Sequence, residues 1–195
     1  MFKKILLGLL ALVLLIIIAS RFQPDSYTVE RTGIIAAPPP VVYAQLIDFR
    51  NWDQFNPWRD LDTNMVLTFT GPEHGVGAQY HWVGNSNAGK GSMTISEARP
   101  HEQVKVDLHF IEPFEGHAVT EYLLAPADGG TVLTQRMTGE HNFLSRIMCL
   151  FTSMDKAIGP MFEVGLERMN KAMQGLEALP ETAGTVLPGN AETAR

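Results

Sequence analysis

The stretch GNSNAGKGS, from Gly84 to Ser92, contains most of a phosphate-binding loop. Such a loop reads G-x-x-x-x-G-K-[ST], in which the final hydroxyl contacts magnesium and a helix follows. Gly91 stands where the hydroxyl residue is required, and the next residues, SMTISEA, alternate between apolar and polar as a strand does. We therefore interpret the stretch as a glycine-rich connection between two strands and expect no nucleotide partner.

Histidine is a second residue type that could carry chemistry. No two histidines have the spacing of a zinc motif, and the single cysteine, Cys149, lies in an apolar run. We therefore predict no metal site, no cofactor and no disulfide. His81 and His109 alternate with apolar neighbours, which places both on the outer face of a sheet. The histidines expected near turns, in solvent, are His74, His101 and His117.

Glu121 is the candidate general acid or base. It lies in AVTEYLLA and shares a face with Val119 and Leu123. If that face is internal, Glu121 is a carboxylate in an apolar cavity, a setting suited to proton transfer. If the other face is internal, Glu121 is solvated, and the alternation does not separate the two registers. The other face carries Ala118, Thr120, Tyr122 and Leu124.

Composition limits the function classes. The chain has 195 residues, of which 45% are hydrophobic and 18% charged, with a net charge of −6. This composition is typical of a folded core. The acidic balance argues against a nucleic-acid partner, because such proteins normally present a basic face.

Residues 1–22 predict a membrane anchor or a signal segment. Lys3 and Lys4 precede a run without charge from Ile5 to Ala19, about 22 Å long as a helix. Ile17 stands where a cleavage site prefers a second small residue, which favours an uncleaved anchor over a cleaved signal. The two lysines should keep the N-terminus cytoplasmic, with the following domain on the extracytoplasmic (periplasmic) side, or secreted if cleavage occurs.

The remaining chain predicts one α+β domain over residues 27–176, followed by a disordered tail over 179–195 that is rich in Pro, Gly, Thr and Ala. One or two short helices follow the proline run after the first strand, starting near Val41 and reaching Trp52. Turn sequences separate the other strands, which is typical of an antiparallel sheet. The predicted strands are 26–37, 65–70, 78–83, 92–98, 103–111, 118–125 and 131–139.

An amphipathic helical block occupies residues 143–173, with apolar residues mostly three or four positions apart. Gly159 and Pro160 predict a kink or a break within it, because proline removes a backbone donor. Packing this block across the concave face of a curved sheet of about seven strands buries both apolar surfaces. Such packing leaves a cavity wherever the facing side chains do not meet.

Five phrases in this order resemble a known superfamily: TVERTGIIAAPPPVVYAQLIDFRNWDQFNPW, GVGAQYHWVGN with GKGSMTISEARP, VDLHFIEPFEG, GGTVLTQRMTG and MDKAIGPMFEVGLERMNK. They resemble the START-like helix-grip superfamily, also called SRPBCC, in its polyketide cyclase/dehydratase and lipid-transport branch. The resemblance covers nearly all of residues 27–176 and implies the helix-grip fold. One departure is Gln135, where this branch often has tryptophan.

Strand alternation predicts which residues would line the cavity and bind a ligand. Trp58 is expected at an entrance, and Gln135 could orient a polar group of the ligand. The alternative is that the same residues pack as a filled core. The sheet residues predicted to face inward are Tyr80, Trp82, Met93, Ile95, Val106, Leu108, Phe110, Leu133, Gln135 and Met137, and those of the helix are Met154, Ile158, Met161 and Phe162.

Three functions remain open on the sequence. The first is a membrane-tethered domain that binds a hydrophobic small molecule or lipid, and a cavity below about 300 Å³ would contradict it. The second is a cyclase/dehydratase-type enzyme that uses Glu121 with Gln135, which an outward Glu121 without another internal acid or base would contradict. The third is a structural or interaction domain with a filled core.

Overall fold

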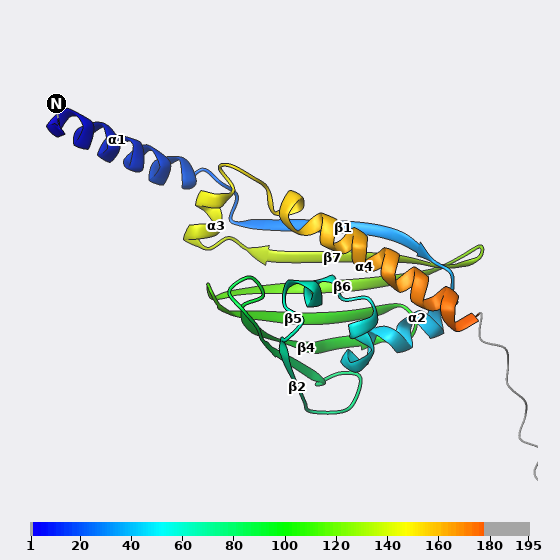
Figure 1. Cartoon of the computed structure of the whole chain (residues 1–195). Coiled ribbons are helices and arrows are strands. Elements are labelled where there is room, and N and C mark those ends of the chain that lie inside the picture. The colour runs from blue at the N-terminus through cyan, green and yellow to red at the C-terminus, as the bar shows by residue number, and fades with distance from the viewer. Residues whose placement is uncertain (1, 178–195) are drawn as a thin grey trace, which may run out of the picture.

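The computed structural model describes residues 2–177, with Leu144, Leu176 and Glu177 by their backbone only. The predicted tail, 179–195, lies outside the described residues. The first element, α1 (Phe2–Ser20), is an apolar helix that projects away from the rest of the molecule (Figure 1). It is the one helix among the described residues that is long and apolar enough to cross a membrane.

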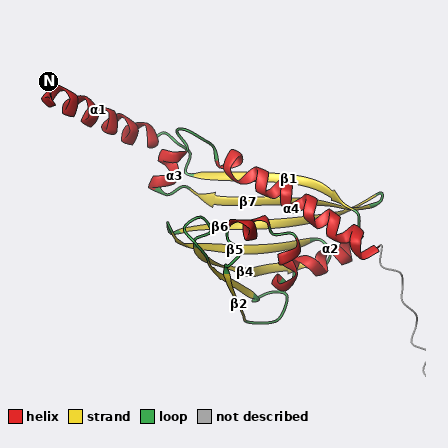
Figure 2. Ribbon diagram, viewed as in Figure 1, coloured by secondary structure: helices red, strands yellow, loops and turns green. Residues whose placement is uncertain are grey.

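The centre of the molecule is an antiparallel sheet of seven strands in the order β1-β7-β6-β5-β4-β3-β2. Strands β2 to β7 follow one another as a meander, and β1 pairs with β7 at one edge. This sheet, with the helices on one side of it, confirms the predicted α+β helix-grip class (Figure 2). The strands are β1 Ser26–Ile35, β2 Val66–Thr70, β3 Gln79–Val83, β4 Lys90–Arg99, β5 Gln103–Glu112, β6 Gly116–Ala127 and β7 Gly130–Glu140.

The segment predicted to be helical up to Trp52 divides into α2 (Pro39–Leu46) and the short 3-10 helix η1 (Phe49–Gln54). Asp48 causes the division, because its side chain accepts a hydrogen bond from the backbone N–H of Arg50 and so caps a new helix. A second 3-10 helix, η2 (Pro57–Leu61), starts in the same way at Asn56.

The predicted break at Gly159 and Pro160 is wrong. The helix α4 (Met154–Glu177) continues through Pro160, and the interruption lies earlier, between α3 (Phe143–Met148) and α4. Arg31 of β1 holds the helix on both sides of this point, because its guanidinium pairs with Asp155 at 2.7 Å and with Glu163 at 2.6 Å. Gly159 lies beneath that guanidinium, where a Cβ would overlap it. These contacts set the position of the helix, and the burial of its apolar face, in which Phe162 is fully buried, outweighs the donor lost at the proline.

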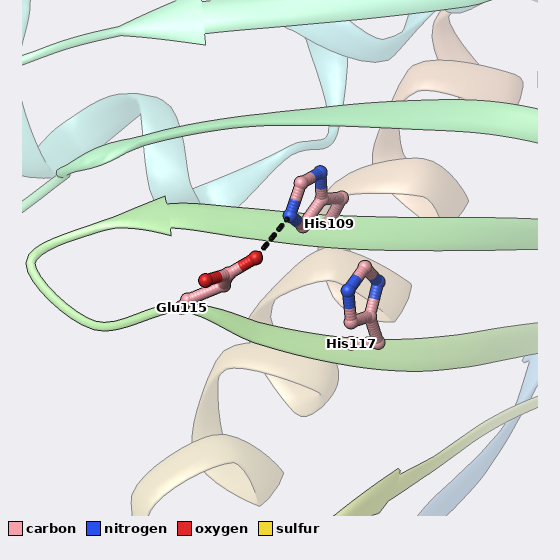
Figure 3. Close-up of side chains that lie close together, drawn as sticks. All are labelled: His109, Glu115 and His117. Carbon is pink, nitrogen blue, oxygen red and sulfur yellow. Dashed lines mark ion pairs between the residues drawn. The ribbon is translucent and has the colours of Figure 1, made fainter.

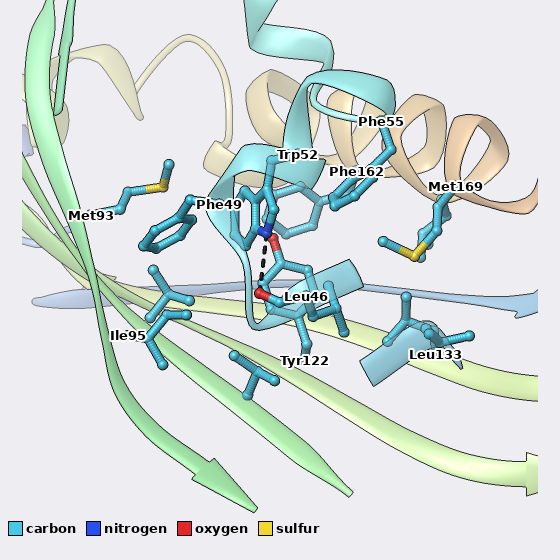
Figure 4. Packing of buried hydrophobic residues seen from close by; sticks show 14 of the residues in the cluster. Leu46, Phe49, Trp52, Phe55, Met93, Ile95, Tyr122, Leu133, Phe162 and Met169 are labelled. Carbon is cyan, nitrogen blue, oxygen red and sulfur yellow. Dashed lines mark hydrogen bonds between the residues drawn. The ribbon is translucent and has the colours of Figure 1, made fainter. Parts of the chain in front are cut away.

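Two covers close the concave face of the sheet. The first is α4, whose buried face carries Phe162, Leu166, Met169 and Met173. The second is the segment α2–η1–η2, from which Phe49, Trp52 and Phe55 point into the core (Figure 4). Trp52 donates its indole N–H to the carbonyl of Leu46, 3.1 Å away, so the buried polar atom of this ring is satisfied.

The GNSNAGKGS stretch connects β3 to β4 as a hairpin, as the sequence indicates. Two of its glycines lie so close to neighbouring backbone atoms that a side chain would not fit. Gly89 has a positive φ of 65°, and a Cβ there would overlap the carbonyl of Glu112. Gly91 lies under the ring of Trp82 and beside the carbonyl of His109, and a Cβ would overlap both.

We predict that Gly91→Ala destabilises the protein by about 1–3 kcal/mol, because the neighbours that a methyl group would meet include backbone. The midpoint of urea unfolding measures this change. Gly116→Ala is the matched control: nothing lies within 4 Å of its added Cβ, so its stability should stay within about 0.5 kcal/mol of the wild type. Equal stability of the two variants would contradict the close packing of Trp82 on Gly91.

Candidate functional site

A cavity of about 370 Å³ lies between the sheet, η2 and α4. Its wall is mostly apolar. The sheet contributes aromatic and aliphatic side chains from the inner face of β3 to β7, and α4 contributes Met154, Ile158, Leu166 and Met169. The volume exceeds the lower bound of about 300 Å³ for small-molecule sites, so the concave face is not fully occupied by core side chains.

Most of the predicted ligand contacts lie on this wall. All but one of them lie on the inner face of a strand, as the alternation of the sequence indicated. The exception is Trp58, which lies beside them on η2. A role in binding stays a prediction for each of them. The predicted contact residues on the wall are Trp58, Tyr80, Trp82, Met93, Leu108, Phe110, Gln135 and Met137.

Two predicted helix residues do not line the cavity. Phe162 is fully buried and packs with its ring edge against Trp58, with centroids 5.9 Å apart, so it supports the wall from behind. Met161 is half-buried on α4 and lies beside the stripe that faces the cavity. Helical spacing identified the apolar side of α4, but the angle at which the helix crosses the sheet decides which of its residues meet the space.

Glu121 lies on the outer face of β6, so the internal register is wrong for this residue. Thr120 and Tyr122 occupy the inner face instead. Glu121 accepts a hydrogen bond of 3.2 Å from the Gln103 amide, and one of its oxygens lies 4.0 Å from the guanidinium of Arg136, its partner across β6 and β7. A cation directly opposite on the outer face favours this register, whereas an apolar interior offers the carboxylate none.

The interior instead carries neutral polar groups from β6 and β7. The Gln135 amide donates to the Tyr122 hydroxyl oxygen at 3.2 Å, and the Thr120 hydroxyl, on the same face, is buried without a partner. Burial raises the pKa of Tyr122 well above that of a free phenol, and it raises the pKa of Tyr80 to about 12. Both phenols are therefore uncharged at neutral pH. From the sequence, Thr120 and Tyr122 were expected on the inner face in only one of the two possible registers of this strand.

The cavity reaches solvent at one end of the sheet. Its lining there includes the exposed residues Phe114, Glu115 and Glu140, with Asn142 of the α3 cap. This is the end at which β1 begins and β7 stops, and so the end from which α1 departs (Figure 1). Among the described lining residues, carboxylates occur only at this mouth, on exposed residues.

A cluster of three polar side chains extends from the mouth of the cavity to the outer face of the sheet. His109 of β5 faces outward, as expected, and stacks on His117 of β6, with Glu115 close to both (Figure 3). Cross-strand pairing joins the two histidines, and the turn before β6 adds Glu115, although their spacing along the chain matches no metal motif.

Comparisons with known proteins find the same fold at low identity. No family model and no curated protein matches the sequence. Among solved structures, protein CV1439 from Chromobacterium violaceum has a TM-score of 0.55 at 16% identity, covering 78% of this chain and 99% of that one. Ara h 8.0201 has a TM-score of 0.54 at 11% identity, with 77% and 99% covered.

The di-domain ARO/CYC StfQ from the steffimycin biosynthetic pathway has a TM-score of 0.55 at 10% identity, covering 80% of this chain and 53% of that one. At such low sequence identities the similarity indicates a shared fold and does not indicate a shared activity. The curved antiparallel sheet, the helix across it and these neighbours agree with the resemblance carried by the sequence. The chain therefore has the helix-grip fold.

Proposed function

We propose that the protein is a membrane-tethered domain that binds one hydrophobic small molecule or lipid between its sheet and α4. The observation that carries the proposal is the apolar cavity of about 370 Å³ in an otherwise packed core. Protein interiors normally close such spaces, because each void forfeits packing contacts. A ligand that fills this space would recover them.

The polar groups of the interior support a ligand with one polar end. The Thr120 hydroxyl is buried without a partner, although buried polar atoms are nearly always hydrogen-bonded. It lies on β6 two residues from Tyr122, whose hydroxyl meets Gln135. A carbonyl or hydroxyl of the ligand beside Thr120 would satisfy this group. With Glu121 outside, the described residues of the interior include no carboxylate for a cyclase-type proton transfer.

The proposed tether is α1. Its 19 residues make a helix about 28 Å long, close to the hydrocarbon thickness of about 30 Å, and none of its membrane-length window is buried against the domain. Lys3 and Lys4 at its start favour a cytoplasmic N-terminus, with the domain on the extracytoplasmic side.

The mouth of the cavity would then face the membrane, because α1 leaves the domain at that end. Large apolar side chains are exposed around it, of which Phe22 and Phe151 are 85% and 78% exposed. Aromatic residues on a surface beside a tether are suited to the membrane interface. Others at this end are Phe114, Phe143 and Met148.

The first prediction concerns the bound molecule. Native mass spectrometry of the full chain, released from membranes of its host, should show one retained apolar species whose exact mass includes oxygen or nitrogen. Met137→Trp should reduce its occupancy to less than half, because the larger ring enters the cavity. Leu123→Trp, on the outer face of β6, is the matched control and should keep it. Equal occupancy in both variants, or an empty wild-type protein across hosts, would contradict the proposal.

The second prediction concerns the direction of the mouth. Phe151→Ser should slow the uptake of a fluorescent fatty acid from vesicles that hold the reconstituted chain, because it removes an aromatic contact with the interface. Val76→Ser is the control. This residue is also exposed, in the turn between β2 and β3 at the other end of the sheet. A mouth that faces away from the bilayer predicts equal rates for the two variants.

The third prediction concerns the side of the membrane. A reporter that is active only in the cytoplasm, fused after residue 195, should stay silent. Lys3 and Lys4 keep the N-terminus in the cytoplasm, so the domain and the reporter lie on the other side of the membrane. The same fusion without residues 1–22 should be active and serves as the control. Activity of the full-length fusion would place the domain in the cytoplasm.

A further inference from the structure

A cluster of three metal-ligating side chains lies on the outer face of the hairpin that joins β5 and β6. His109 and His117 are direct partners across the two strands, so their side chains project from the same face. The rings stack with centroids 4.3 Å apart and 9° between their planes. Glu115, in the turn, brings a carboxylate oxygen to 3.6 Å from Nε2 of His109 (Figure 3).

One ligand atom from each residue lies within 4.8 Å of the others. Donor atoms of a tetrahedral zinc site, with bonds of about 2.0–2.1 Å, stand roughly 3.4 Å apart. An imidazole binds a metal in the plane of its ring, so the two rings must leave their parallel stack to meet one ion. Glu115 and His117 are exposed and are free to turn toward His109. His109, the half-buried member, supplies a fixed point.

The His109 ring gives a second, independent indication. Its Nε2 is shielded from solvent and has no hydrogen-bond partner. Buried polar atoms nearly always have a hydrogen-bond partner. The described residues provide none for this nitrogen, so a partner from outside the protein is expected. A metal ion at this point would accept its lone pair.

We propose that His109, Glu115 and His117 bind a divalent transition-metal ion. Two imidazoles and one carboxylate are a donor set typical of Zn²⁺, with a fourth position left for water or an outside ligand. The hard ions Mg²⁺ and Ca²⁺ prefer oxygen donors and do not suit two nitrogens.

The position of this site gives the ion a role. Glu115 and His117 belong both to the cluster and to the lining of the cavity mouth, and Phe114 projects from the same turn. The turn is also tied to α3, because the Asn142 amide donates to the carbonyl of Glu115 at 3.2 Å. A bound ion would fasten Glu115 to both strands and hold the mouth in one conformation. This consequence rests on the proposed function, whereas the metal site itself does not.

The test is a zinc titration of the full chain in detergent, purified through a tag without histidine and freed of metal by a chelator. Isothermal titration calorimetry should show one Zn²⁺ per chain, and Mg²⁺ should show none. His117→Ala and Glu115→Gln should each weaken the zinc affinity at least about tenfold, since even changes in the residues that support a metal ligand cost about that much. Neither change removes a buried side chain, so both variants should remain folded.

His74→Ala is the matched control, because His74 is exposed in a loop outside the cluster and its loss should leave the zinc affinity unchanged. A simple ion pair between His109 and Glu115 predicts no stoichiometric zinc binding, and that result would overturn the site. Zinc binding that survives His117→Ala would place the ion elsewhere and overturn it as well. Zinc is added without ligand, so an empty cavity leaves the measurement unaffected.

Discussion

The structure depends on how α4 is fixed to one edge of the sheet. Arg31 of β1 reaches across Gly159 to Asp155 and Glu163, and the Asn170 side chain accepts the backbone N–H of Ala36 at 2.8 Å. Exposed ion pairs add little stability, but here they set direction and register while apolar burial supplies most of the energy. Because α4 is fixed beside β1, it leaves the middle of the concave face to a second cover.

That second cover is the segment with η1 and η2, and the cavity is the space where it does not meet α4. Trp52 and Phe55 fill one part of the concave face, and Phe162 supports Trp58 from behind. Aromatic rings are stiff and large, so two covers that meet at an angle do not close every gap. The same geometry directs the opening toward the sheet end from which α1 departs.

Much of the fold could be predicted from the sequence. Each strand was visible as an alternating run between turn residues, and the helical spacing after residue 143 indicated a long amphipathic cover. Alternation also assigned Tyr80, Trp82 and Met93 to the inner wall, where they lie. Local rules failed where tertiary contacts dominate, as at Pro160, where the burial of Phe162 and Leu166 against the sheet keeps the helix continuous.

The sequence by itself determined the elements, because hydrophobic period and turn chemistry are local properties that each segment carries alone. It determined the apolar N-terminal helix for the same reason. Only the tertiary structure decided the register of β6, which turns Glu121 outward and Thr120 and Tyr122 inward, because a shift of one residue exchanges the two faces. The grouping of His109, Glu115 and His117 was decided in the same way, because only the pairing of β5 with β6 brings them together.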